Sequence, residues 1–562
     1  MDRIWLEHYP TGVPADITDQ AAAYSSLADL FEQSCHAHAD NVAYTSLDVS
    51  LTYGRLREMA HAFAAWLQAQ GVAKGDRVAL MLPNLLQYPI CLFGTLAAGA
   101  VVVNTNPLYT AHELTHQLKD SGATTVVVAE NFAHTLQAAM PGTAVRRVIV
   151  TSIGELLGFP KGVLTDFVVR HVRRRVPAWR ISGAHRLRDV LAAGARSRFQ
   201  SATLTHEDLA ALQYTGGTTG VAKGAMLTHG NLVSNVCQAH AWVRPFLHGE
   251  EECIVTALPL YHIFALTANC LTFIMLGARN LLIADPRDIP GFVKSLGSVP
   301  FTALTGVNTL FNALLNNAAF AKLDFSRLKV ALGGGAAVQE AVARRWLELT
   351  GVPIAQAYGL TETSPAVTIN PLDHVAFNGS IGLPVPSTDV AIRDQGRTLP
   401  LGEQGEICVK GPQVMKGYWN CPDETAKAFD ADGWLLTGDI GIMNEQGYVF
   451  LLDRKKDMIL VSGFNVYPNE VEAAALALPA IRDAAAIGVP DEHSGEAVKL
   501  FVIRKDPSLT EAQVIAHCHT LLTGYKVPKH VEFREDLPRS NIGKVLRRKL
   551  KDEAGHMAVP AD

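Results

Sequence analysis

"RVALMLPNLLQYPICLFGTLAAGAVVVN", residues 77–104, is the stretch that decides the fold class. Between Arg77 and Glu113 the chain has no Asp, Glu, Lys or Arg, as in a membrane-spanning helix. However, Pro83 and Pro89 interrupt the stretch, and a membrane span needs about 20 consecutive apolar residues. We therefore predict a buried strand in "RVALML", a helix in "NLLQYPICLFGTLAAG" that ends at Gly99, and a second strand in "AVVVN". This is a β-α-β unit, which is typical of a parallel sheet with helices on its faces.

The same alternation of strands and helices extends outward from this unit. Further apolar strands are predicted in "ATTVVVAE" (123–130) and "ARNLLIAD" (278–285). Between about 380 and 450, short alternating pieces such as "GEICVKGP" and "GYVFLLDRK" indicate a β-rich unit. We predict an α/β fold. Residues 1–452 would form a large N-terminal domain of several subdomains, with sheets flanked by helices plus the β-rich unit. Residues 453–562 would form a small, mobile α+β C-terminal domain, with a hinge at about 453.

The composition indicates a globular protein. The chain has 562 residues, of which 48% are hydrophobic and 18% charged, which excludes a disordered chain and predicts two to four domains or subdomains. The net charge is −5, so no nucleic-acid partner is expected.

The eight cysteines are scattered and no C-x-x-C occurs, which makes a structural zinc site or a disulfide framework improbable. The N-terminus lacks an apolar core of signal-peptide length, and the final "VPAD" is not a peroxisomal S-K-L address. We expect a cytoplasmic protein with reduced thiols.

A loop rich in glycine and threonine is the first candidate for chemistry. "YTGGTTGVAK" (214–223) is nearly free of charge and too rich in Gly for a helix or a strand. Its N–H groups, hydroxyls and single ammonium, Lys223, suit a polyanion. The loop does not match the G-x-x-x-x-G-K-[ST] pattern, because Ala222 precedes Lys223 and Gly224 follows it. A phosphate-binding loop and an ordinary surface loop are both open at this point.

Five other stretches are candidates for a site, and most of them also have a purely structural interpretation. Glu362 in "QAYGLTET" could bind Mg²⁺ or begin a helix, and Asp439 in "DGWLLTGDIG" could accept ribose hydroxyls or form an Asx-turn. His262 in "LPLYHIFAL" is usually a core residue, and Lys544 in "PRSNIGKVLRRKL" is by itself a solvated lysine. "ALGGGAAV" (331–338) has three glycines after a strand, where a backbone must approach another group closely.

A basic run stands apart from these motifs. "FVVRHVRRRVPAWR" (167–180) has five Arg and one His among aliphatic and aromatic residues. It is either a solvated helix face or an interfacial element that contacts anionic lipid.

In this order and spacing, the stretches resemble the acyl-adenylate-forming superfamily, which includes acyl-CoA synthetases, peptide-synthetase adenylation domains and luciferases. The resemblance covers the chain from about residue 25 to 555. "DGWLLTGDIGIMNEQGYVFLLDRKKDMILVSGFNVYPNEVE" (432–472) looks like the signature segment of fatty acyl-CoA synthetases. "NLLQYPICLFGTL", "DPRDIPG" and "LTGYKVPKHVEF" look like the bacterial long-chain fatty-acid–CoA ligases.

The resemblance implies a two-step reaction. A fatty carboxylate attacks the α-phosphate of ATP to give acyl-AMP and pyrophosphate, and the thiol of coenzyme A then displaces AMP. ATP, Mg²⁺, coenzyme A and a fatty acid are the implied ligands. A homodimer and a peripheral contact with an anionic membrane, at its cytoplasmic face, are further expectations.

The resemblance also assigns roles to residues. The phosphate loop would comprise Thr215, Gly216, Gly217, Thr218, Thr219, Gly220 and Lys223. Glu362 would bind Mg²⁺, and Thr361 would contact the α-phosphate. Gly333, Gly334, Gly335, Ala336, Tyr358 and Gly359 would form the adenine site. Asp439 and Arg454 would hold the ribose. Lys544 would bridge the acyl carboxylate and the phosphate. His262 would lie at the acyl pocket, and Gly463 would line the coenzyme A channel.

Three alternatives compete with this interpretation. The acid could instead be medium-chain, aromatic or otherwise hydrophobic. A P-loop ATPase or kinase would need a true Walker A motif, which the chain lacks. A non-catalytic nucleotide-binding regulator should have lost Lys544 or Glu362, and both are present.

Overall fold

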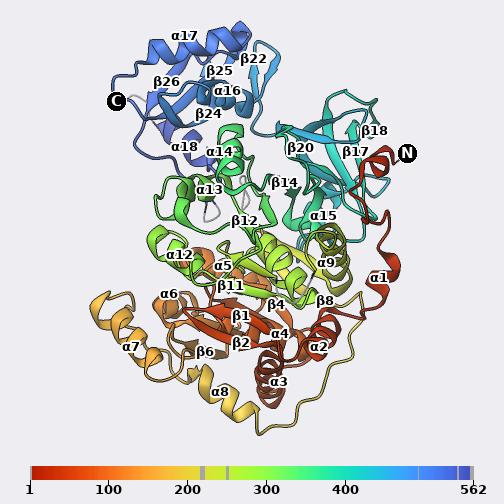
Figure 1. The fold of residues 1–562 in the computed structure, drawn as a ribbon, viewed down its shortest axis with the longest axis vertical. Coiled ribbons are helices and arrows are strands. Elements are labelled where there is room, and N and C mark those ends of the chain that lie inside the picture. Colours follow the sequence, from red (N-terminus) through yellow and green to blue (C-terminus); the bar gives the residue numbers. More distant parts are fainter. Residues whose placement is uncertain (1–2, 216–221, 249–251, 492, 541–542, 557–562) are drawn as a thin grey trace. The chain divides into compact units, whose positions relative to one another are not determined.

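The computed structural model describes residues 3–215, 222–248, 252–491, 493–540 and 543–556. The chain divides into two compact units (Figure 1). The first comprises Met1–Gly216, Ala222–Asp389 and Lys410–Phe429, and the second includes Val390–Val409 and Asp430–Asp562. The predicted domain boundary at 453 falls inside the second unit, near the end of one of its strands, and stays a prediction.

The first unit contains a seven-stranded sheet built around the predicted β-α-β unit. Its strand order is β7-β6-β5-β3-β4-β8-β9, and all neighbours are parallel except β8 and β9. The strands are β3 (Arg77–Met81), β4 (Val101–Asn104), β5 (Thr125–Ala129), β6 (Arg147–Thr151), β7 (His185–Arg186), β8 (Leu209–Tyr214) and β9 (Gly224–Thr228).

The predicted β-α-β unit is confirmed. The helix α4 (Gln87–Ala97) connects β3 and β4, which pair in parallel from Arg77 opposite Val101. Every residue of α4 is buried, which explains why the stretch has no charge. Gly99 has φ +80°, a left-handed conformation that favours glycine at the end of the helix.

A second, nine-stranded sheet completes the first unit. Its order is β16-β15-β14-β13-β12-β10-β11-β1-β2, with parallel pairing from β14 to β1 and antiparallel strands at both edges. The strands are β1 (Val42–Ser46), β2 (Val49–Thr52), β10 (Cys253–Thr256), β11 (Arg279–Leu282), β12 (Ala303–Gly306), β13 (Val330–Gly333), β14 (Ile354–Gly359), β15 (Ala366–Ile369) and β16 (Leu383–Pro384).

Helices cover these sheets, as the hydrophobic strands require. Ala79 and Met81 of β3 pack in one cluster with residues of α5 (Ala111–Ser121) and α6 (Ala133–Ala139). Val78 and Leu80 point to the opposite face of the sheet and are also buried. The other helices are α1 (Thr18–Ala22), α2 (Leu27–Ala37), α3 (Tyr53–Ala69), α5 (Ala111–Ser121), α6 (Ala133–Ala139), α7 (Lys161–Phe167), α8 (Leu187–Gly194), α9 (His229–Val243), α10 (Ile263–Ala265), α11 (Thr272–Met275), α12 (Ile289–Leu296), α13 (Asn308–Leu315), α14 (Glu340–Thr350) and α15 (Pro422–Ala428).

Short 3₁₀ or π turns punctuate the first unit. They are η1 (Ile4–His8), η2 (Glu130–Phe132), η3 (Val168–Val172), η4 (Leu266–Leu271), η5 (Phe320–Lys322) and η6 (Thr361–Thr363). Within the described ranges, no helix is both long and apolar enough to cross a membrane.

The second unit contains two five-stranded sheets. The first has the order β18-β17-β19-β20-β21 and confirms the predicted β-rich segment. Its strands are β17 (Asp389–Asp394), β18 (Arg397–Thr398), β19 (Gly405–Lys410), β20 (Leu435–Met443) and β21 (Val449–Arg454). The other sheet has the order β23-β22-β25-β24, and β26 pairs with β25. Its elements are β22 (Ile459–Val461), β23 (Phe464–Val466), α16 (Pro468–Leu476), β24 (Ile481–Asp491), β25 (Gly495–Arg504), α17 (Glu511–Leu521), η7 (Gly524–Lys526), β26 (His530–Phe533) and α18 (Arg547–His556).

The eight cysteines are free, and all but Cys421 are buried. Burial raises the pKa of thiols such as Cys91 and Cys270, so these side chains are protonated packing groups. The prediction of reduced thiols is consistent with this arrangement.

Candidate active site

Three parts of the predicted nucleotide site lie at strand ends of the first unit: the loop after β8, the glycine run after β13 and the "YGLTE" segment at the end of β14. The loop after β8 comes first. Thr215 directly follows β8, and Lys223 directly precedes β9, so the two residues flank the tip of one hairpin. The Thr215 N–H donates to the Lys223 carbonyl at 2.9 Å and closes the base of the loop. Gly216, Gly217, Thr218, Thr219 and Gly220, which were predicted to bind phosphate, lie outside the described residues.

Lys223 and Glu362 are linked through one tyrosine. The Tyr418 hydroxyl donates to Glu362 Oε1 at 2.7 Å, and Lys223 Nζ lies 4.6 Å from the centre of the Tyr418 ring. Burial, followed by the charge of Glu362, raises the pKa of Tyr418, so the hydroxyl remains a donor. The predicted phosphate lysine and the predicted metal ligand therefore both contact Tyr418, Lys223 at the face of the ring and Glu362 at the hydroxyl.

Lys223 already has a carboxylate partner. Its Nζ lies 2.7 Å from Glu424 Oε2 on α15, and the two side chains are partly exposed. The hydrogen bond from Lys223 holds the pKa of Glu424 down at about 2. Because an exposed ion pair is worth little, an arriving phosphate can replace Glu424 as the partner of Lys223.

The glycine run and the "YGLTE" segment lie at the ends of neighbouring parallel strands. β13 ends at Gly333, which pairs with Gln356 of β14, and η6 follows β14 with Thr361 and Glu362. Ligands of parallel α/β sheets bind at this carboxyl edge. Tyr358 lies within β14.

Close packing of the backbone explains why glycine occupies several positions at this edge. A Cβ on Gly334 would lie 3.0 Å from the Phe264 ring, and one on Gly359 would lie 1.9 Å from the Pro365 carbonyl oxygen. Gly335 has φ +77°. The backbone is therefore packed closely here, and a side chain at Gly334 or Gly359 would displace it. Ala336 follows as a half-buried residue.

His262 is neither an ordinary core residue nor a cation. Its Nδ1 accepts from the Phe264 N–H at 3.3 Å, so it caps the short helix α10. Burial lowers the pKa of His262 to about 4, and the ring is neutral at pH 7. Phe264 also contacts the glycine edge at Gly334, which connects His262 to the predicted adenine site.

The predicted ribose residues form a pair in the second unit. Arg454 Nε lies 3.1 Å from Asp439 Oδ1, and the two residues are opposite each other on β21 and β20. The Asx-turn interpretation of Asp439 is wrong, because Asp439 lies inside β20, a strand that runs through Gly438 with φ +71°. Asp439 is buried beside this guanidinium, and a carboxylate is an acceptor that can receive hydrogen bonds from hydroxyl groups.

Lys544 is held beside this pair. It follows a turn in which Gly543 has φ +80° and the Ser540 N–H donates to the Lys544 carbonyl at 2.7 Å. Burial and, to a smaller extent, the charge of Arg454 lower the pKa of the Lys544 ammonium to about 8. The Asp439 carboxylate opposes this shift. Lys544 is therefore not the solvated lysine that its local sequence indicates.

Gly463 and Asp453 differ in their surroundings. Gly463, between β22 and β23, has φ +85° and open space where a Cβ would stand. Asp453 is buried near the end of β21, where Oδ1 accepts from the Arg454 N–H and Oδ2 from the Asn469 N–H, both at 2.7 Å. Burial raises the pKa of Asp453, against the opposing charge of Arg547.

The structure thus brings the described candidates together in two groups. In the first unit the group is Thr215, His262, Gly333, Gly334, Gly335, Ala336, Tyr358, Gly359, Thr361 and Glu362, together with Lys223. In the second unit the group is Asp439, Arg454 and Lys544, whereas Gly463 lies in a separate turn. Sequence reasoning missed Tyr418 and Glu424, since neither belongs to a recognisable motif.

The residues present fit a Mg²⁺ ion. Magnesium prefers hard oxygen donors and is usually held by one or two carboxylates together with phosphate oxygens. Glu362 is a half-buried carboxylate oriented by the Tyr418 hydroxyl, and Lys223 contacts the ring of the same tyrosine. One oriented carboxylate, completed by phosphate oxygens and waters, is a donor set that such an ion accepts.

Comparisons with known proteins show what the chain is similar to. Residues 31–419 match the family model described as AMP-binding enzyme, and residues 470–544 match the model of the AMP-binding enzyme C-terminal domain. A long-chain-fatty-acid–CoA ligase of Escherichia coli O6:H1 is 56% identical over 556 residues, which are 99% of each chain. The crystal structure of ATP-bound MatB from Rhodopseudomonas palustris is 30% identical, with a TM-score of 0.83, and covers 95% of this chain and 100% of its own. A Bacillus subtilis o-succinylbenzoate coenzyme A synthetase in complex with ATP and magnesium ion is 25% identical, with a TM-score of 0.75, over 93% of this chain and 99% of its own.

Proposed function

The chain belongs to the family of AMP-binding enzymes, and on this premise we infer that it is a long-chain fatty-acid–CoA ligase. It activates a fatty acid with ATP to an acyl-AMP, releases pyrophosphate, and transfers the acyl group to coenzyme A. The observation that carries the residue-level mechanism is the contact chain Lys223–Tyr418–Glu362. It joins a phosphate-binding cation to a metal-binding carboxylate.

The first step has to bring two anions together. At 4 Å and an effective dielectric constant of about 20, two unit charges repel by about 4 kcal/mol. The protein therefore has to place positive charge and N–H dipoles where negative charge develops, and it needs no nucleophile of its own. Lys223 and Lys544 supply such charge in this proposal.

In the first unit, Lys223 would leave Glu424 and bind the β- and γ-phosphates with Thr215 and the loop that follows. Thr361 would contact the α-phosphate. Glu362 would hold Mg²⁺, which neutralises phosphate charge when bound. The Gly333–Ala336 run, Tyr358 and Gly359 would flank the adenine.

In the second unit, Asp439 and Arg454 would hold the ribose hydroxyls. Lys544, which lies beside this pair, would then bridge the acyl carboxylate and the α-phosphate. Neutral His262 would lie at the acyl pocket, where a protonated ring would instead pair with the carboxylate and hold it in the ground state. Gly463, in its open turn, would line the path of coenzyme A.

Pyrophosphate release with ATP, coenzyme A and a panel of carboxylic acids tests the activity. A series of saturated acids of increasing length should give its highest kcat/KM with long chains, and AMP should be the nucleotide product. Release of ADP would indicate a kinase and contradict the proposal. Preference for a medium-chain or aromatic acid would contradict only the long-chain assignment and not the ligase activity. The series has to span many chain lengths, since one methylene changes the discrimination between two acids by only about 1–3 kcal/mol.

Cellular location and assembly belong to the same proposal. We place the protein in the cytoplasm, with a peripheral contact on an anionic membrane. A homodimer remains an option that sedimentation velocity can test.

A Tyr418→Phe variant tests the contact chain. Phenylalanine keeps the ring face that Lys223 contacts and removes only the hydroxyl that orients Glu362. A hydrogen bond to a charged group contributes about 1.5–3 kcal/mol, so we expect the Mg²⁺ requirement of adenylation to rise about tenfold. Pyrophosphate exchange over a range of Mg²⁺ concentrations gives this number. An unchanged Mg²⁺ dependence would show that Tyr418 has only a packing role.

We also propose that the two half-reactions need two poses of residues 453–562, with Asp453 as the hinge. Lys544 serves adenylation, whereas the Gly463 turn has to reach the same nucleotide for thioester formation, and one rigid pose is unable to present both. Asp453 supports this role because it lies where β21 ends and its carboxylate binds the Arg454 and Asn469 amides.

Asp453→Pro should separate the half-reactions. Proline fixes φ near −65° and favours whichever pose tolerates that angle. One half-reaction should survive while the other falls steeply; pyrophosphate exchange reports the first and coenzyme A-dependent release from preformed acyl-AMP the second. Asp453→Ala is the matched control, since it removes the same carboxylate and leaves φ unrestricted. Equal, mild losses in both steps would count against the hinge.

A further inference from the structure

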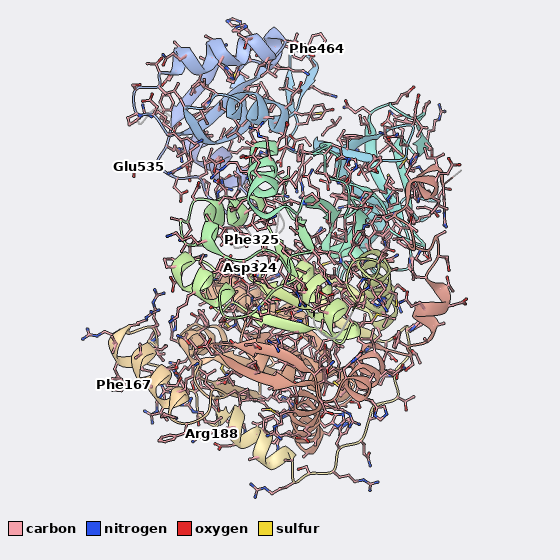
Figure 2. All side chains as sticks on the ribbon, in the orientation of Figure 1. Phe167, Arg188, Asp324, Phe325, Phe464 and Glu535 are labelled. Atoms are coloured by element: carbon pink, nitrogen blue, oxygen red, sulfur yellow. The ribbon has the colours of Figure 1, made fainter. Side chains whose placement is uncertain are left out.

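The α7 segment, residues 159–175, exposes more large hydrophobic surface than any other part of the described chain. Its exposed apolar side chains are Phe159, Val163, Leu164, Phe167 and Val172. Phe159 is 90% exposed and Val172 66%, and the four most exposed large hydrophobic side chains of the described residues all belong to this segment. Figure 1 shows α7 at the periphery of the first unit, and Figure 2 shows Phe167 on its outer side. A cluster of this kind marks an interaction site.

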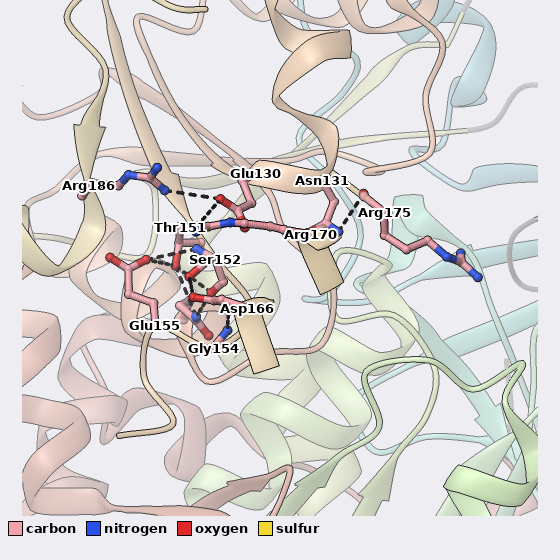
Figure 3. A network of polar contacts seen from close by, with 11 residues as sticks. Glu130, Asn131, Thr151, Ser152, Gly154, Glu155, Asp166, Arg170, Arg175 and Arg186 are labelled. Atoms are coloured by element: carbon pink, nitrogen blue, oxygen red, sulfur yellow. Dashed lines mark hydrogen bonds and ion pairs between the residues drawn. The ribbon is translucent and has the colours of Figure 1, made fainter. Parts of the chain in front are cut away.

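The apolar residues share one side of α7. Val163 and Leu164 precede Phe167 by four and three positions, which places the three side chains on one helix face. The inner side is polar: Asp166 accepts from the Ser152 hydroxyl at 2.6 Å and from the Gly154 N–H at 2.8 Å (Figure 3). The hydrophobic face is therefore turned outward by an anchored helix and is not the product of a loose segment.

The arginines of the segment fall into two classes. Arg170 binds Glu130 through two hydrogen bonds of 2.9 and 2.7 Å, and Glu130 is buried, so Arg170 is a structural cation. Arg186 reaches the same carboxylate at 3.4 Å. The sequence could not separate Arg170 from its neighbours.

The second class is Arg173, Arg174 and Arg175, which are exposed. Within the described ranges, none of the three has a carboxylate within ion-pair distance. The Arg175 carbonyl accepts from Asn131 Nδ2 at 3.1 Å, and its side chain extends away from the anchored network (Figure 3). Three cations thus follow directly after the exposed apolar face.

We propose that the α7 segment docks the protein on an anionic lipid bilayer, with the apolar face of α7 in the interface and Arg173–Arg175 on the headgroups. An exposed apolar helix face bordered by arginines matches a membrane surface, where acyl chains accept the apolar side chains and anionic lipids attract the cations. A protein partner would have to combine an apolar pocket with a separate acidic patch, whereas a bilayer offers both at every point. This proposal rests on the peripheral membrane contact proposed above and names the segment that makes it, and it can fail independently of the ligase activity.

Vesicle co-sedimentation of the full-length protein tests the proposal. The probes are vesicles of phosphatidylcholine alone and vesicles that also contain phosphatidylglycerol, at low and at high salt. The variants are R173Q/R174Q/R175Q and V163S/L164S/F167S. The matched control is R146Q/R287Q/R344Q, which removes the same charge from exposed arginines elsewhere in the first unit.

We expect wild type and the control to bind the anionic vesicles alike. The R173Q/R174Q/R175Q variant should lose on the order of 100-fold in partitioning to anionic vesicles at low salt. Each arginine near an anionic surface adds a similar amount to the binding free energy, and the three contributions add up. The V163S/L164S/F167S variant should lose the part of the binding that resists high salt, since salt screens only the charges.

Three results would overturn the proposal. Wild type could fail to bind either vesicle, or both segment variants could bind as wild type does. Alternatively, the segment variants could shift a monomer–dimer equilibrium in sedimentation velocity without any effect on vesicles, which would make the segment an interface between two copies of the chain. Acyl-CoA formation from a soluble short-chain acid, measured without vesicles, shows separately whether the ligase function holds.

Discussion

Replacing Lys544 by alanine should slow acyl-adenylate formation by about 10²–10³, while ATP still binds. The ammonium lies beside the Asp439–Arg454 pair that we assign to the ribose, and it would meet the negative charge that develops between carboxylate and α-phosphate. Alanine removes this charge and leaves the ribose pair in place. Pyrophosphate exchange measures the rate, and equilibrium binding of ATP provides the control.

The pKa of Lys544 adds a pH dependence to this result. The ammonium is charged below a pKa of about 8 in the free protein and loses its charge above it. The kcat/KM of adenylation should therefore fall as the pH rises through about 8, since this parameter reports the free enzyme. Bound ATP brings negative charge and raises the pKa of Lys544, so kcat should persist to higher pH. The Lys544→Ala variant should lack the decline, and a wild-type rate in this variant would remove Lys544 from the mechanism.

Glu362→Gln should slow adenylation by about 10² at limiting Mg²⁺, with partial recovery as Mg²⁺ is raised. The substitution keeps the shape of the side chain but removes the charge that would bind the ion, and a catalytic metal contributes several kcal/mol of charge stabilisation. Initial rates of pyrophosphate exchange across a Mg²⁺ titration measure the effect.

Glu424→Gln is the matched control for Glu362→Gln. It removes a second carboxylate close to Lys223, one that we regard as the partner of this lysine before ATP binds. It should leave the Mg²⁺ requirement unchanged and lower the KM for ATP slightly, because Lys223 no longer has to leave an ion pair. Near-normal activity of Glu362→Gln at limiting Mg²⁺ would mean that Glu362 only begins the short helix η6.

Much of the fold could be predicted because its signals are local. The charge-free stretch 77–104 forms β3, α4 and β4 as expected, and the change of composition near 380 marks the β-rich sheet. Burial on both faces of a parallel sheet requires continuous apolar strands, and such strands are visible in a sequence without any knowledge of their neighbours. The alternative of an Asx-turn at Asp439 could not be excluded from the sequence, because a strand that passes through a glycine has the same local composition as a turn.

The candidate site could be predicted only where a motif surrounds the residue. Glu362 and Lys544 stand in such motifs, but Tyr418 and Glu424 do not. The Lys223–Glu424 pair joins residues 201 positions apart, and no local pattern relates them. The role of Tyr418 depends likewise on the antiparallel bridge between Tyr418 and Ala225, which exists only after the chain has folded.

The sequence by itself determined the α/β class, the order of the chemical stretches and the family they resemble. The tertiary structure alone decided the electrostatic state of individual groups. It made Arg170 a structural partner of buried Glu130 while Arg173–Arg175 remained exposed, and it lowered the pKa of Lys544 to about 8. The physical reason is that hydrophobic periodicity is a property of neighbours along the chain. Desolvation and Coulomb interactions instead depend on burial and on distances in space, which residues far apart in the sequence determine together.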